Sequence, residues 1–84
     1  MIKVFEGFRY NYEPGYTMSV TSEDNGDIIL SANKEGLISI ANLLIQLAED
    51  RFSVGHHFHL NEDNGLGKGS IELTVIKDWK INVW

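Results

Sequence analysis

The residues of this chain best suited to chemistry are three histidines that lie close together, His56, His57 and His59. The segment around them has the composition of a β-strand. Because side chains alternate between the two faces of a strand, His57 and His59 are expected on one face and Phe58 and Leu60 on the other. Two imidazoles at this spacing can chelate a metal ion if a third ligand completes the site. They can equally contact a partner protein.

A carboxylate lies in the next predicted strand, residues 70–77. If the two strands form a hairpin with Asn61 opposite Ser70, His59 faces Glu72 across it. A cross-strand pair of this kind contributes about 0.2–1 kcal/mol. We therefore predict contact between His59 and Glu72. A small metal-binding protein or metal-dependent enzyme that uses the paired histidines is one hypothesis for the function.

Other catalytic patterns are missing from the sequence. No serine, cysteine or pair of carboxylates is arranged as a nucleophile with its base, so no catalytic residue and no cofactor are assigned. The chain has no cysteine, which excludes disulfides and thiolate metal sites. The glycine-rich loop of residues 62–69 lacks the spacing of a phosphate-binding loop and precedes a strand instead of a helix. We expect it to be a mobile hairpin loop.

A long amphipathic helix is predicted over residues 33–50, with Asn33 as its N-cap. Its polar residues recur every three or four positions and form one narrow stripe, which consists of Glu35, Ser39, Asn42, Gln46 and Glu49. The rest of its surface is apolar. We therefore expect a sheet to cover most of its circumference and the polar stripe to face solvent.

Strand-like segments precede and follow this helix. They cover residues 2–8, 16–22, 28–32, 55–61 and 70–77, and residues 78–84 continue the last strand or form a sixth. The Asn25-Gly26 pair is typical of a tight hairpin. We predict one α+β domain over residues 1–84, with a mostly antiparallel sheet of about five strands and the helix on one face. Trp79 is expected in the core and Trp84 in a dimer or partner contact.

The net charge of −5 argues against nucleic acid as a partner, because phosphates are bound by clustered Lys and Arg. An acidic surface suits a basic protein partner. Glu62 and Asp63 follow the histidine strand and extend the predicted contact surface. The N-terminal segment does not have the pattern of a signal peptide, and no apolar run is long enough for a membrane span. A cytoplasmic protein without a membrane partner is expected.

Three motifs connect residues 28–77 with a known family. They are Asn33-Lys34-Glu35-Gly36 at the start of the helix, Gly55-x-His57-x-His59-Leu60 in the next strand, and Glu72-Leu73 after the loop. With these motifs the chain resembles the immunity protein 32 family of bacterial polymorphic toxin systems. In that family an acidic residue often follows the His-Leu pair, where this chain has Asn61. The resemblance implies a small α+β protein that binds and neutralises a toxin of its own cell without catalysis.

The leading hypothesis is therefore an immunity protein that binds its cognate toxin stoichiometrically. The predicted contact residues are His57, His59, Glu72, Glu62 and Asp63. The metal-dependent protein described above is the second hypothesis. A third is a homodimeric structural domain joined through the sheet face that the helix leaves open.

Overall fold

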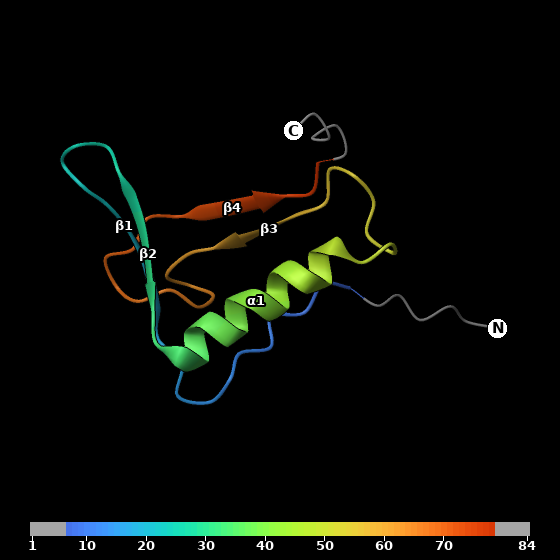
Figure 1. The fold of residues 1–84 in the computed structure, drawn as a ribbon, viewed down its shortest axis with the longest axis horizontal. Coiled ribbons are helices and arrows are strands. Elements are labelled where there is room, and N and C mark those ends of the chain that lie inside the picture. The colour runs from blue at the N-terminus through green and yellow to red at the C-terminus, as the bar shows by residue number, and fades with distance from the viewer. Residues whose placement is uncertain (1–6, 79–84) are drawn as a thin grey trace.

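The structure is a computed structural model that describes residues 7–78. Its elements are, in chain order, β1 (Met18–Ser22), β2 (Ile28–Ala32), α1 (Lys34–Ala48), β3 (His57–Leu60) and β4 (Leu73–Ile76). Strands β1 and β2 form one antiparallel hairpin, and β3 and β4 form a second (Figure 1). The α+β class is confirmed, but the predicted single sheet of about five strands is wrong.

The structure describes only a few residues of the two strands predicted at the ends of the chain. Of the strand predicted at residues 2–8, only residues 7 and 8 are described, and they are not part of a strand. The predicted strand at residues 78–84 lies outside the described residues except for Asp78. The roles expected of Trp79 and Trp84 lie outside them as well.

The first hairpin forms where the sequence predicts it. Gly26 takes a φ of 93°, which a side chain would disfavour, and the Glu23 N–H donates to Asp27 O at 2.8 Å. The Asn25 side chain accepts from the Asp27 N–H at 3.0 Å. These bonds close the turn and set the register, in which Val20 lies opposite Leu30.

The helix begins as predicted, with Asn33 as its N-cap. Asn33 Oδ1 accepts from the Gly36 N–H at 2.8 Å and from the Thr17 N–H at 2.9 Å, and Asn33 Nδ2 donates to Gly15 O at 3.0 Å. One side chain therefore connects the helix to the first residues of the β1–β2 hairpin. Because of these bonds the helix leaves β2 at a sharp angle, as Figure 1 shows.

The loop between β3 and β4 occupies the edge of β1 that β2 leaves open. The Gly67 N–H donates to Met18 O and the Ile71 N–H to Val20 O, both at 2.8 Å. Leu66, in the same loop, is buried in the core. The loop is thus packed against β1 and is not the free, mobile hairpin end that its glycines suggested.

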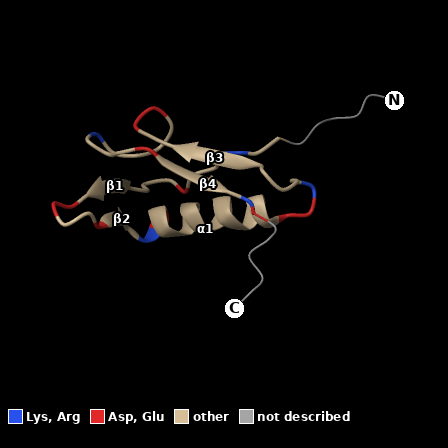
Figure 2. Cartoon of the chain, turned by 90° about the horizontal axis from the view of Figure 1, so that it is seen from above, with Lys and Arg blue, Asp and Glu red and all other residues tan. Residues whose placement is uncertain are grey.

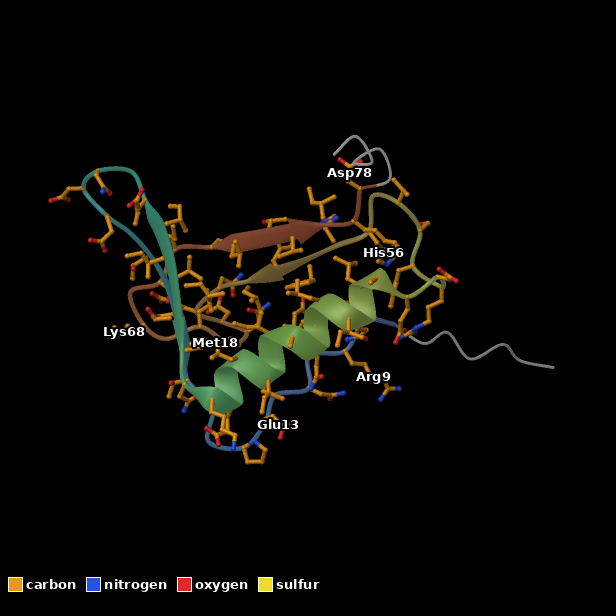
Figure 3. All side chains as sticks on the ribbon, viewed as in Figure 1. Arg9, Glu13, Met18, His56, Lys68 and Asp78 are labelled. Carbon is orange, nitrogen blue, oxygen red and sulfur yellow. The ribbon has the colours of Figure 1, made fainter. Side chains whose placement is uncertain are left out.

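The core lies between α1 and the two hairpins. Its buried residues come from β1, α1, β3 and the β3–β4 loop, and they are Met18, Val20, Ile40, Leu43, Leu47, Phe58, Leu60 and Leu66. Figure 3 shows Met18 in the space enclosed by these elements. No helix in the part of the chain that the structure describes is long and apolar enough to cross a membrane.

The orientation of α1 differs from the prediction. Ser39, in the polar stripe, is fully buried, whereas the apolar residues Leu37 and Ile45 are 55% and 64% exposed. The cause is the segment of residues 9–13, which runs along the polar side of the helix (Figure 3). The Glu13 N–H donates to Ser39 Oγ at 2.8 Å. Gln46 accepts from the Arg9 N–H at 2.7 Å and donates to Arg9 O at 2.8 Å.

The stripe is therefore a polar surface whose side chains bond to the backbone of residues 9–13. It is not only a solvated face, and the expectation that a sheet covers most of the helix is wrong. Four large aliphatic residues of α1 remain at least 40% exposed, namely Leu37, Ile38, Leu44 and Ile45.

Tyr12 makes the fold sensitive to alkaline pH. Its hydroxyl donates to Asn64 O, and burial, with smaller contributions from Tyr16 and Tyr10, raises the pKa of Tyr12 to about 12. The neutral phenol is thus favoured in the folded state, and its stabilising effect is complete below the unfolded-state pKa of about 10. We expect this contribution to be lost as the pH rises from about 10 to about 12.

Urea unfolding at a series of alkaline pH values measures this effect. Tyr12→Phe should be less stable than the wild type at neutral pH by about 1 kcal/mol, because the bond to Asn64 is lost. The difference between the two proteins should shrink as the pH rises. A difference that stays constant up to pH 12 would contradict the assignment.

Candidate functional site

Strand β3 exposes two histidines on one face and buries two apolar residues in the core on the other. Phe58 and Leu60 are buried, whereas His57 and His59 are exposed. The predicted assignment of faces is confirmed. Phe58 also stacks on Phe8, with ring centroids 5.0 Å apart, so the strand is anchored by aromatic contacts as well as by aliphatic ones.

The register of the β3–β4 hairpin differs from the predicted one by two residues. His59 lies opposite Thr74 and His57 opposite Ile76. The reason is that Ile71 already bonds to β1, so pairing with β3 starts only at Leu73. The loop turns at once after β3, where the side chain of Asn64 accepts from the Asn61 N–H at 2.8 Å.

His59 nevertheless contacts Glu72, as predicted. His59 Nδ1 lies 2.7 Å from Glu72 Oε2 and 2.9 Å from Thr74 Oγ1. The carboxylate is a diagonal neighbour of the histidine, still within reach of a long side chain. Since a carboxylate accepts, Nδ1 carries the proton and the Nε2 atom of neutral His59 is an acceptor.

His57 has the same arrangement. Its Nδ1 lies 3.2 Å from Gly55 O, a group that can only accept, so Nδ1 donates. The rings of His57 and His59 lie 5.0 Å apart at an angle of 85°. Within residues 7–78 neither Nε2 atom has a hydrogen-bond partner. Both are available to donors of another molecule.

The third histidine is not part of this arrangement. The His56 ring packs on Phe52, with ring centroids 4.8 Å apart. Among the described residues no group of three or more His, Asp or Glu side chains is placed to hold a metal ion. In this structure the Nδ1 atoms of His57 and His59 lie within hydrogen-bond distance of protein oxygens.

The same face contains an apolar residue that the sequence-based site did not include. Ile76 lies opposite His57 and is 60% exposed, and Thr74 is exposed between Ile76 and Glu72. We call the surface formed by His57, His59, Glu72, Thr74 and Ile76 the histidine face. Because side chains alternate along residues 70–77, Ile76 is expected on the same face as Glu72. An isoleucine among polar residues was therefore the feature of the sequence that could have indicated this surface.

The predicted acidic residues of the loop are exposed but bond only within the loop. Glu62 Oε2 accepts from the Gly69 N–H, and the Asp63 N–H donates to Asn61 Oδ1 at 2.9 Å. No bond between described residues joins either carboxylate to the histidines. The structure thus brings His57, His59 and Glu72 together and leaves Glu62 and Asp63 as separate charges in the loop that follows β3.

Comparison with known proteins gives one match. The family described as immunity protein 32 matches residues 27–79, more than half of the chain. The matched range contains β2, α1 and the whole β3–β4 hairpin, and therefore the complete histidine face. No curated protein and no solved structure matches the chain.

Proposed function

The chain belongs to the immunity protein 32 family, and we propose that it neutralises a cognate toxin protein by binding it through the histidine face. This membership confirms the resemblance that the sequence motifs indicated. The family's description supports a partner-binding function without catalysis. We further propose that the chain is one domain and acts in the cytoplasm of the cell that makes the toxin.

The observation that carries the proposal is the combination of groups on the histidine face. Ile76 offers a large exposed apolar side chain, and the two imidazoles next to it have Nε2 atoms without a hydrogen-bond partner within the described residues. Protein interfaces commonly have an apolar centre ringed by polar groups. Pairing with β4 and the buried side chains of Phe58 and Leu60 hold the backbone of β3 in place, which lowers the conformational entropy lost on binding.

The charge of the chain supports a basic toxin. Twelve acidic residues oppose seven basic ones, and Glu62 and Asp63 are exposed beside β3. Such charges accelerate encounter with a positively charged partner. We propose that Glu62 and Asp63 attract the toxin and that His57, His59 and Glu72 contact it directly.

Charge variants measured over a range of salt concentrations distinguish residues that attract the toxin from residues that contact it. Glu62→Gln combined with Asp63→Asn should lower the association rate several-fold at low salt and leave the dissociation rate nearly unchanged. Glu23→Gln combined with Asp24→Asn removes the same charge from the β1–β2 turn and serves as the control. Stopped-flow measurements over a range of salt give both rates. A wild-type association rate that does not fall with salt would contradict electrostatic attraction.

The function itself is tested with the toxin domain encoded beside this chain. Mixing the purified proteins should give a one-to-one complex by titration calorimetry and abolish the toxin's activity in proportion to the amount bound. Co-expression should protect cells from the same domain. Tight binding that leaves toxin activity intact, or no binding, would contradict the proposal.

A further inference from the structure

Strand β2 has an open edge rich in aliphatic residues. Within residues 7–78 its only strand partner is β1. Its first three residues, Ile28, Ile29 and Leu30, are 57%, 40% and 41% exposed. Native proteins usually protect such edges with charges, proline or a covering segment, because an open edge pairs readily with another chain. None of the five residues of β2, Ile28–Ala32, is charged or a proline.

The backbone of this edge is oriented for pairing. The Val20 N–H donates to Ser70 Oγ at 3.2 Å and Val20 O accepts from Ile71 at 2.8 Å, so both groups point away from β2. In an antiparallel pair of strands, the backbone N–H and C=O groups of two opposite residues either bond to each other or all point away from the partner strand. Leu30, opposite Val20, therefore directs its N–H and C=O outward.

The same alternation applies to the ends of the strand. Met18 O accepts from the Gly67 N–H and lies on the side of β1 away from Ala32, its partner. Ile28 is two residues before Leu30 and points the same way. The outer edge of β2 thus offers donors and acceptors at Ile28, Leu30 and Ala32.

We propose that the outer edge of β2 pairs with the β2 strand of a second copy of this chain. The two strands run antiparallel about a two-fold axis at Leu30, so that Leu30 pairs with Leu30 of the partner subunit. Ile28 then lies opposite Ala32 of the partner subunit. The two hairpins become one four-stranded sheet, and an isologous dimer results.

The charges at the two ends of β2 favour a second copy of this chain as the partner of the edge. The acidic β1–β2 turn precedes the strand, and Lys34, in the first turn of α1, follows it (Figure 2). Antiparallel self-pairing places Asp27 beside Asn33 and Lys34 of the partner subunit, at both ends of the interface. Lys34 is unfavourable at the positive end of its own helix dipole, and a neighbouring carboxylate offsets this.

The apolar surface is adequate for a weak dimer. Ile28 and Leu30 share a face of the sheet with Ser22 and Val20, the face on which α1 packs. A two-fold axis perpendicular to the sheet leaves both helices on that face. Six large aliphatic residues of β2 and α1 other than Ile29, which points to the opposite face of the sheet, are 41–64% exposed: Ile28, Leu30, Leu37, Ile38, Leu44 and Ile45.

A single pair of edge strands with these side chains makes a small interface, and we therefore expect association to be weak and reversible. The proposal is independent of the toxin, because β2 and the histidine face belong to different hairpins. A dimer formed through β2 leaves the histidine face of each subunit open.

Sedimentation velocity over a wide concentration range tests the dimer. The wild type should dimerise reversibly, and Ile28→Lys should raise the dissociation constant at least about tenfold. Ile76→Lys is the matched control, since Ile76 is similarly exposed, at 60%, and lies on β4. It should dimerise as the wild type does. A wild type that stays monomeric at the highest concentration, or equal weakening by both variants, would overturn the proposal.

Two further measurements cover the case in which Ile28→Lys does not fold. Lys34→Glu should weaken dimerisation, and Asp27→Lys in the same chain should restore it, because the pair across the axis is reversed. Hydrogen exchange should show that protection of the Leu30 amide rises with protein concentration. Protection that is independent of concentration, or a double variant as weak as the single one, would contradict pairing through β2.

Discussion

Gly36→Ala is expected to destabilise the fold by about 3 kcal/mol, although alanine is the better helix former by about 1 kcal/mol. A Cβ atom at Gly36 would lie 2.1 Å from Thr17 O and 2.9 Å from Ala32 Cβ. The nearest atom belongs to the backbone and cannot rotate away. To make room, α1 must move away from Thr17, the residue before β1, which stretches the bond between Asn33 and Thr17.

Urea unfolding followed by circular dichroism measures this loss. Gly67→Ala is the matched control, because a Cβ there would lie 3.6 Å from Met18 O, an ordinary contact. It should change the free energy of unfolding by less than about 1 kcal/mol. A Gly36→Ala protein as stable as the wild type would show that α1 is not held against β1 as described.

Ile76→Lys is expected to weaken toxin binding by about a hundredfold or more, since residues at the centre of an interface carry most of its energy. If the toxin is basic and contacts the histidine face, as proposed, the buried lysine adds repulsion to the lost apolar area. Ile76 is 60% exposed in the free chain, so the fold should be unaffected.

Titration calorimetry with the toxin domain gives the affinity, and circular dichroism confirms the fold. Ile28→Lys introduces the same change at a position that is 57% exposed on β2. It should bind the toxin as the wild type does. If the two variants weaken toxin binding equally, the toxin does not select the β3–β4 hairpin and the proposed contact surface is wrong.

Features set by neighbouring residues were predictable from the sequence. The Asn33 cap, the hairpin at Asn25-Gly26 and the opposite faces of His57 and Phe58 all occur as expected. Each depends on backbone preference or on the period of a helix or strand, which a short window of sequence contains.

Features set by distant segments were not predictable in this way. Ser39 is buried because the backbone of Glu13 bonds to it, and nothing in the helix itself indicates that partner. The β3–β4 register moved by two residues because Ile71 bonds to β1 instead. The same bonds let a loop take the place of a further strand, which divided the expected sheet into two hairpins.

The site was predictable to a similar extent. His59 and Glu72 do meet, at 2.7 Å, although through a different register, since a diagonal carboxylate is also within reach of the ring. Ile76 was not predicted as a site residue because an aliphatic side chain performs no chemistry. For a surface that binds a protein, an apolar residue between polar ones is as informative as a histidine.

NMR of the chain while its toxin domain is added tests binding through the histidine face most directly. We predict that the ring C–H signals of His57 and His59 shift, and that the amides of β4 become protected from hydrogen exchange. The amides of Ile28 and Leu30 should remain as they are in the free protein at the same concentration. Unchanged histidine signals, with new protection on β2 or α1, would contradict binding through the histidine face.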